Sequence, residues 1–457
     1  MDPKNFSWEI VTSLSRLDWI LENSGEHIVF DFETTGVKYW ETDFKVIGVA
    51  IGGDLPAKLD AIYVPFFTFN EDTKTLDDLG RKELAFRFFR ELVSKKVIAH
   101  NAAFDCSILD YYNIPHTLYI DTMILWHGLD NAVYRKYGLK SAQVDLLGWE
   151  ESNDKDLEKH VKERLERYNI DTKEWKGKMY VGDTQILGRY AALDAYSTWL
   201  LFKHLYEKNS LLASSFIEFF NEFLWPYSKA LTSQYERGIL VDKSLLIELK
   251  QNLTTQSKEQ AQLFKKAFSG LISEIEREEL LKLIKTYKTL KGKKNAVKRA
   301  KESSLFNINS KLHLGKLLFE KLQLKYNSKT ETGRPQVDDK LLTELKQYTS
   351  DIDKLLEYNA LTKRIQYVEQ YIEYADENSI LLPNSNLVAT ISGRIAGYKP
   401  NLLQMPKEDI NILKSFRARD GFSFIELDLV SAEPYTLAHF SKDPVLLNVV
   451  NNNWDIY

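Results

Sequence analysis

Two carboxylates lie two residues apart in an apolar stretch near the start of the chain. Asp31 and Glu33 are set in residues 28–36, whose β-branched and aromatic residues predict a buried strand. Residues two apart in a strand share one face, so both acids should point the same way. Two like charges side by side are unfavourable, and a pair of divalent cations held by oxygen ligands is the natural counter-charge. The alternative is a strand whose two acids both face water.

A third acid follows a later predicted strand. Residues 97–99 read as a strand that runs into residues 100–105, where a helix is expected to begin. Asp105 would then lie in the first turn of that helix, at a sheet edge of the kind where α/β proteins place their sites. The helix N-terminus alone would also stabilise it. Taken by itself, Asp105 is better explained as a helix cap or a solvated acid.

Tyr190 and Asp194 lie four residues apart in a pattern that predicts a helix from about residue 186. That spacing puts both side chains on one helix face. A phenol beside a carboxylate can orient a water molecule while the carboxylate holds a metal ion. A core tyrosine with a nearby surface acid explains the same pair equally well.

The elements that position these residues follow from the hydrophobic pattern. Residues 1–27 predict a short helical lead-in, and residues 46–51 and 61–64 predict further strands. A helix is expected over about residues 81–94. The polar, Glu- and Lys-rich residues 150–178 predict a solvated helix and loop.

Helical periodicity dominates the second half of the chain, from residue 211 to about residue 373. After a short strand near residues 239–241, two long helices are predicted over about 243–268 and 270–287. The basic run 282–301 near the tip of this hairpin could hold a phosphate backbone, although most such runs are solvated faces. Its residues predicted to contact DNA are Lys291, Lys293 and Lys294.

Length and composition bound the class of protein. The 457 residues predict about two to four domains, and 44% hydrophobic with 28% charged residues is ordinary for a globular protein. A net charge of −4 neither indicates nor excludes nucleic acid, because only a local basic patch is needed. The single cysteine, Cys106, excludes an internal disulfide and favours a reducing compartment. We find neither a signal core nor a membrane-spanning stretch, and expect a cytoplasmic protein.

Three spaced motifs occur together in one order: Asp31-x-Glu33, Asn101-x-x-x-Asp105 and Tyr190-x-x-x-Asp194. Together they resemble the motifs of the DEDDy 3′–5′ exonucleases, and most specifically the proofreading domain of family A DNA polymerases. The resemblance covers about residues 1–208. It implies an α/β, RNase H-like domain that hydrolyses DNA with two metal ions. Asp121 and Asp145 match no ligand position and are predicted to be structural.

The resemblance also implies a role for each motif residue. Two Mg²⁺ or Mn²⁺ ions, roughly 4 Å apart, would activate water and neutralise the leaving oxygen. Asp31 would bridge the ions, Glu33 and Asp194 would complete one site, and Asp105 would support the other through water. Tyr190 would orient the attacking water. The residues implied to contact the terminal nucleotide or its strand are Thr34, Val37 and Asn101.

Two later stretches extend the likeness to the polymerase region. Residues 390–406 resemble the palm segment in which an arginine reads the primer minor groove, with Arg394 in that position and Gln404 near the end of the same segment. Residues 424–433 resemble polymerase motif A. There Asp428 would bind metal at the end of an apolar strand, and Glu433 would block a ribose 2′-hydroxyl.

This motif A departs from the family pattern. Leu429 stands where a tyrosine is usual, and Tyr435 stands where an arginine is usual.

The predicted organisation is an exonuclease domain over residues 1–208, a mostly α-helical thumb over 209–380, and an incomplete α+β palm over 381–457. The lysine-bearing fingers helix and the second palm aspartate have no match in this chain. We therefore expect hydrolysis, but not synthesis, unless a C-terminal subunit or a remainder lost by truncation joins it. The expected ligands are a single-stranded 3′ end and a primer–template, in the cytoplasm of a bacterium or a phage host.

Two rival classes remain. A stand-alone exonuclease of the RNase D type would share the four acids but would not account for the Arg394 segment or motif A. A non-catalytic DNA-binding subunit would keep a basic thumb and lose the acids.

Overall fold

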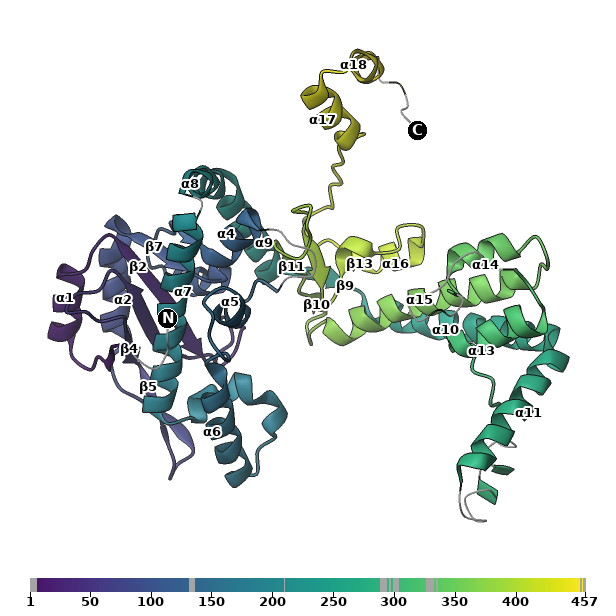
Figure 1. Cartoon of the computed structure of the whole chain (residues 1–457), viewed down its shortest axis with the longest axis horizontal. Helices are drawn as coiled ribbons and strands as arrows, with labels where there is room; N and C mark the ends of the chain where they lie inside the picture. Colours follow the sequence, from purple (N-terminus) through teal and green to yellow (C-terminus); the bar gives the residue numbers. More distant parts are fainter. Residues whose placement is uncertain are drawn as a thin grey trace. The chain divides into compact units, whose positions relative to one another are not determined.

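The structure is a computed structural model that describes residues 6–130, 136–208, 210–287, 294–295, 297–298, 304–325, 333, 336–452 and 454. The chain divides into two compact units, whose elements are labelled in Figure 1. The first unit joins Met1–Gly238 to Leu382–Met405, and the second joins Ile239–Leu381 to Pro406–Tyr457. These units divide the chain differently from the predicted functional boundaries near residues 208 and 380, which remain a prediction.

The described part of the first unit contains a six-stranded mixed sheet. Its strands, in spatial order, are β1 (Trp8–Ile10), β4 (Ala61–Pro65), β3 (Val46–Gly53), β2 (His27–Thr34), β7 (Lys96–Ala99) and β8 (Ile120–Asp121). Strand β3 runs antiparallel to both β2 and β4, whereas the β1–β4, β2–β7 and β7–β8 pairs are parallel. The strands predicted around residues 28, 46, 61 and 97 are confirmed.

The predicted helical lead-in is wrong for its first part. Residues Trp8–Ile10 form strand β1, because their backbone pairs with the edge of β4 over three residues. The helix is shorter, α1 (Leu14–Glu22), and begins where the Ser13 hydroxyl accepts a hydrogen bond from the Arg16 amide.

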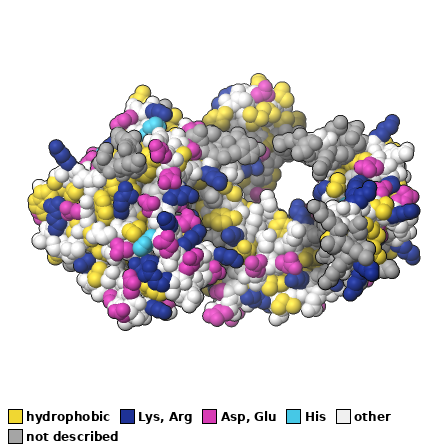
Figure 2. Space-filling model, turned by 60° about the horizontal axis from the view of Figure 1, so that its bottom comes forward, with side chains coloured by type: hydrophobic (Ala, Val, Ile, Leu, Met, Phe, Trp, Pro, Cys, Tyr) yellow, Lys and Arg dark blue, Asp and Glu magenta, His cyan; other side chains and the backbone are white. Residues whose placement is uncertain are grey.

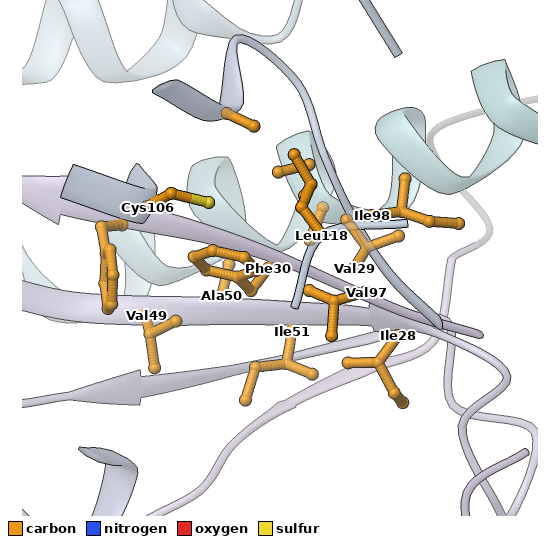
Figure 3. Close-up of a cluster of buried hydrophobic side chains, with 14 of the residues drawn as sticks. Ile28, Val29, Phe30, Val49, Ala50, Ile51, Val97, Ile98, Cys106 and Leu118 are labelled. Carbon is orange, nitrogen blue, oxygen red and sulfur yellow. The ribbon is translucent and has the colours of Figure 1, made fainter. Parts of the chain in front are cut away.

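The core of the first unit lies on strands β2, β3 and β7. Figure 3 shows Ile28, Val29 and Phe30 of β2 beside side chains of the two neighbouring strands, with Cys106 approaching from a helix. Phe30 is 1% exposed, and the Cys106 thiol is buried and free. The strand that carries Asp31 and Glu33 is therefore fixed at the centre of the sheet.

Helices surround this sheet, and α7 (Thr184–Lys208) packs against β2, β3 and β4 (Figure 1). The other described helical segments of this unit are α2 (Lys82–Glu91), η2 (Leu92–Ser94), α3 (Ala102–Tyr111), α4 (Thr122–Leu129), α5 (Leu139–Asp145), α6 (Asp154–Arg167), η3 (Thr172–Val181), α8 (Ser210–Phe219), η4 (Phe220–Leu224), α9 (Trp225–Arg237) and η6 (Leu402–Gln404). Two hairpins complete it: β5 (Phe67–Asn70) with β6 (Thr75–Asp78), and β11 (Asn384–Asn386) with β12 (Ala396–Tyr398).

Residues 150–178 are more than the solvated helix and loop that their composition predicts. One face of α6 buries Leu157, Val161 and Leu165 in a separate apolar cluster, which also contains Trp175 of η3. These apolar residues recur at helical spacing, and the charged residues between them make the segment look polar in composition. The cluster also contains Ile47 of β3 and Leu187 of α7, so this segment packs against the rest of the first unit.

The second unit is mostly helical, with α10 (Lys243–Ala267) packed along α15 (Ile352–Tyr374). Its other described elements are β9 (Ile239–Val241), α11 (Ser269–Thr286), α13 (Lys311–Gly315), η5 (Lys316–Lys321), α14 (Asp339–Leu345), β10 (Ile380–Leu381), α16 (Ile410–Lys414), β13 (Phe416–Arg417), α17 (Ala432–Ser441) and α18 (Pro444–Asn451). The strand near residue 239 and both long helices are confirmed. Lys291 and Lys293 lie outside the described residues, and Lys294 is exposed.

The predicted apolar strand before Asp428 is not formed. Residues 422–430 are exposed and without strand structure, and Leu427 is 91% exposed. A strand needs a hydrogen-bonded neighbour, and among the described residues none pairs with this segment. The apolar pattern is real, but its partner strand is not within the described chain.

Among the helices that the structure describes, none combines the length and apolar character required to cross a membrane. On the face shown in Figure 2, Lys and Arg side chains are interspersed with Asp and Glu. This mixed pattern agrees with the small net charge.

Candidate functional site

Four acids that are distant in the sequence come together beside the central strand. Asp31 and Glu33 lie on β2, Asp105 lies in the first turn of α3, and Asp194 lies on α7, which packs on β2. Glu33, Asp105 and Asp194 are each no more than 5% exposed. The three motifs that were recognised by spacing therefore contribute to one buried cluster.

The four acids act on one another's pKa values. Burial, followed by the charges of Asp105, Glu33 and Asp194, raises the pKa of Asp31 well above its usual range. Burial and the neighbouring Asp194 raise the pKa of Glu33 to about 8. Burial raises the pKa of Asp105 to about 7, although backbone amides partly oppose the shift. A cluster of this kind is unfavourable when fully ionised and requires positive charge.

Asp105 is placed by the backbone of the neighbouring strand. Its Oδ1 accepts a hydrogen bond from the Phe32 amide at 3.0 Å, which ties the start of α3 to β2 between the two strand acids. Asn101 immediately precedes α3 with φ +60°, a left-handed conformation that asparagine tolerates. The expectation of a helix beginning here is confirmed.

Asp121 is a structural acid, as its mismatch to the motifs predicts. Its carboxylate accepts hydrogen bonds from the amides of Asn101 at 3.0 Å, Ala102 at 2.8 Å and Met123 at 2.8 Å. It therefore joins the starts of α3 and α4. Burial raises its pKa to about 6 against the effect of these donors.

Three polar residues that sequence reasoning does not find surround Asp194. Lys140 Nζ donates to both carboxylate oxygens, at 2.6 Å for Oδ2, and Asn153 Nδ2 donates to Oδ1 at 3.0 Å. Gln143 Nε2 lies 3.3 Å from the same Oδ1. Lys140 and Gln143 lie three residues apart on α5, and this spacing could have indicated that both side chains share one helix face. Asn153 lies in a charged segment, whose composition suggests only contact with solvent.

Tyr190 lies in the same network. The Lys140 ammonium is 4.3 Å from the centre of its ring, and Asn153 Nδ2 donates to its backbone carbonyl at 3.0 Å. Burial and the charge of Asp194 raise the pKa of the Tyr190 hydroxyl well above its usual range. The phenol consequently remains protonated and able to donate a hydrogen bond at neutral pH.

The part of the chain that the structure describes shows no group of three acids, histidines or cysteines arranged to hold a metal ion. Two of the four acids, Asp105 and Asp194, are instead hydrogen-bonded to protein groups. Lys140 and Asn153 occupy the oxygens of Asp194, and the Phe32 amide occupies one oxygen of Asp105. The chemistry of the donors still fits Mg²⁺ or Mn²⁺, because both prefer carboxylate oxygens and the crowded acids need cations. Coordination by Asp31, Glu33, Asp105 and Asp194 remains a prediction.

A cavity of about 640 Å³ in the first unit is lined by residues that lie close in sequence to Glu33 and Asp105. Val37 and Asn101 line it, as do the aromatic side chains of Tyr39, Phe104, Tyr235 and Tyr398. Thr34 follows Glu33 on β2, and its hydroxyl donates a hydrogen bond to the Gly36 carbonyl at 2.7 Å. Val37 is 67% exposed, so it is open to a ligand.

The predicted polymerase residues are distributed over both units. Arg394 and Gln404 are exposed in the first unit, whereas Asp428 and Glu433 are exposed in the second, the latter in the first turn of α17. Their implied roles in primer binding, metal binding and sugar selection remain predictions.

Comparison with known proteins identifies both halves of the chain. Residues 9–209 match the family model described as 3′-5′ exonuclease, and residues 248–457 match the model for DNA polymerase family A. The second half of the chain belongs to DNA polymerase family A. Exonuclease and polymerase domains of this family generally use divalent metal ions, and DNA polymerases bind DNA. The predicted resemblance and fold class are confirmed.

Relatives of this chain include bacterial enzymes named DNA polymerase I. The protein of Borreliella burgdorferi is 25% identical over 466 residues, covering 100% of this chain and 44% of the relative. That of Synechocystis is 25% identical over 476 residues, covering 100% and 42%. The thermostable enzyme of Thermus aquaticus is 31% identical over 158 residues, covering 33% and 19%. The chain therefore spans less than half the length of these relatives.

A solved structure shares the fold of this chain. It is the POL domain of Pol1 from M. smegmatis, in complex with DNA primer-template and dNTP, with a TM-score of 0.69 and 17% sequence identity. The match covers 98% of this chain and 65% of that one. The shared fold therefore includes both halves of this chain.

Proposed function

We propose that this chain removes nucleotides from the 3′ end of DNA by hydrolysis, as the proofreading part of a family A polymerase. The observation that carries the proposal is the buried cluster of Asp31, Glu33, Asp105 and Asp194, drawn from three sequence motifs. Crowded carboxylates in a cleft are typical of hydrolytic metal sites.

Bound among these acids, a pair of Mg²⁺ or Mn²⁺ ions would supply a hydroxide near neutral pH and would neutralise the leaving oxygen. The carboxylates of Asp31, Glu33, Asp105 and Asp194 would provide the oxygen ligands. Tyr190 keeps its proton, so its hydroxyl can orient the attacking water by donating a hydrogen bond. Water attacks the terminal phosphorus and the 3′ oxygen of the preceding nucleotide leaves, giving a 5′-mononucleotide and a shortened strand.

The neighbouring cavity supports a single strand as the substrate. Its aromatic side chains offer flat faces on which bases can stack without regard to sequence, at about 1–3 kcal/mol per base. Val37 and Asn101 line this cavity, and Thr34 follows Glu33 at the end of β2, so we assign the three residues to the terminal nucleotides. Unpaired bases fit such a surface better than a closed duplex does.

Synthesis would require more than this chain. We assign Arg394 and Gln404 to the primer–template, Asp428 to a palm metal ion and Glu433 to the sugar site. Lys291, Lys293 and Lys294 are assigned to the DNA backbone. The exposed residues 422–430 need a partner strand, which a C-terminal polymerase part, as a separate subunit or as further chain, would provide. The setting is the cytoplasm of a bacterium or a phage host.

The rival classes account for less of the chain. A stand-alone RNase D-like exonuclease would leave residues 248–457, which match the polymerase model, without a purpose. A non-catalytic DNA-binding subunit would not need the buried acids, whose ionisation is unfavourable without a cation.

The test is degradation of 3′-labelled single-stranded DNA and RNA by the purified chain. We expect release of 5′-mononucleotides from DNA with Mg²⁺ or Mn²⁺, and none with EDTA. On a primer–template with all four dNTPs, the chain by itself should shorten the primer and not extend it. Absence of metal-dependent DNA degradation would contradict the proposal, and a strong preference for RNA would favour the RNase D-like class.

A further inference from the structure

A lysine stands where a cation is required among the four acids. Lys140 comes from α5, outside the three motifs, and its Nζ donates to both oxygens of Asp194. Its charge also acts on Asp31 and Glu33. Lys140 is thus the protein's own counter-charge for this cluster.

Contacts other than the one with Asp194 also hold Lys140 in its position. Its Nζ also donates to Asn153 Oδ1 at 2.7 Å, and the ammonium stands over the Tyr190 ring at 4.3 Å. Asn153 in turn donates to Asp194 and to the Tyr190 carbonyl. While no divalent cation is bound to Asp194, these contacts hold Lys140 and Asn153 in one geometry.

The same contacts set up a competition. An oxygen of Asp194 that is held by the ammonium has to leave it before it can coordinate a divalent cation, because two positive charges cannot share that oxygen closely. The Lys140 side chain is 31% exposed, so it can turn toward water, whereas the Asp194 side chain is buried and cannot.

Resting on the proposed function, we propose that Lys140 is a positioning residue that acts as a built-in placeholder cation. It holds Asp194 and Tyr190 in place when the protein is metal-free, and it yields the carboxylate when divalent metal binds.

This arrangement predicts opposite effects on stability and on metal affinity. Lys140→Gln should lower the melting temperature of the full chain in EDTA, because Asp194 loses its counter-charge. The same variant should bind Mn²⁺ about tenfold more tightly, since no ammonium has to be displaced. The free energy of this change lies between the contributions of exposed and of buried ion pairs. With saturating Mn²⁺, its melting temperature should return to that of the parent.

Two variants separate this role from a merely structural one. Lys140→Arg keeps the charge and should retain the parental Mn²⁺ affinity. Lys162→Gln removes a comparable lysine, paired with Glu158 at 2.6 Å on α6, and should leave Mn²⁺ binding unchanged.

The measurement is a Mn²⁺ titration followed by electron paramagnetic resonance, with melting temperatures recorded in EDTA and in Mn²⁺. Weaker Mn²⁺ binding by Lys140→Gln, or an equal loss of stability with and without Mn²⁺, would overturn the placeholder role. Failure of the parent chain to bind Mn²⁺ would overturn the proposed function as well. The two failures are therefore distinguishable.

Discussion

Replacement of Asp31 by alanine will lower the rate of DNA hydrolysis on the order of a thousandfold or more. Asp31 is at the centre of the cluster, since Asp105, Glu33 and Asp194 all act on its carboxyl group. Loss of the ligand placed between two ions removes charge stabilisation from both sides of the reaction, and three powers of ten correspond to about 4 kcal/mol. The measurement is single-turnover release of mononucleotides from 3′-labelled single-stranded DNA in Mg²⁺.

The same change should not damage the fold. Removing one of several buried acids that repel one another should raise the melting temperature in EDTA. Asp145→Ala provides the matched control, because Asp145 is an exposed acid at the end of α5 and should leave the rate of hydrolysis unchanged. Near-parental hydrolysis by a folded Asp31→Ala chain would contradict the assignment of the site.

Raising the pH will destabilise the metal-free chain. Glu33 has a pKa of about 8 in the folded protein against 4.5 ordinarily, and Asp105 about 7 against 3.8. Between these values the folded chain holds protons that the unfolded chain has lost, so unfolding releases protons and higher pH favours it. The free energy of unfolding in EDTA should fall from about pH 5 to pH 8, by about 1.4 kcal/mol per pH unit for each proton involved.

Divalent metal should reverse this dependence, because its ligands bind it in their deprotonated form. Urea unfolding at several pH values, with EDTA and with saturating Mg²⁺, measures both slopes. Glu33→Gln removes one titrating group and should flatten the slope in EDTA. A free energy of unfolding that is independent of pH over this range would show that the acids do not repel one another as the structure indicates.

Much of the site could be predicted from the sequence, because the chemistry is concentrated in short motifs on regular elements. Asp31 and Glu33 are two residues apart, which places them on one face of a strand. Tyr190 and Asp194 are four residues apart, which places them on one face of a helix. Their meeting point follows from α7 packing on β2, which spacing alone does not give. The family resemblance supplied that step.

The rest could not be predicted, because it depends on contacts distant in sequence. Asn153 reaches Asp194 from a loop whose neighbours are charged, so its composition carries no sign of burial. Residues 8–10 became a strand only because the edge of β4 was open to them. The stretch before Asp428 shows the reverse, since a good strand pattern stays exposed when no neighbour pairs with it.

The most direct test of the whole account is the number of Mn²⁺ ions bound at the site formed by β2, α3 and α7. A crystal of the chain soaked in Mn²⁺ and a short DNA strand, measured at the manganese absorption edge, would count and locate them. We expect two anomalous peaks among the carboxylates of Asp31, Glu33, Asp105 and Asp194, and none there in Asp31→Ala. Peaks elsewhere, or a DNA 3′ end bound away from these acids, would contradict it.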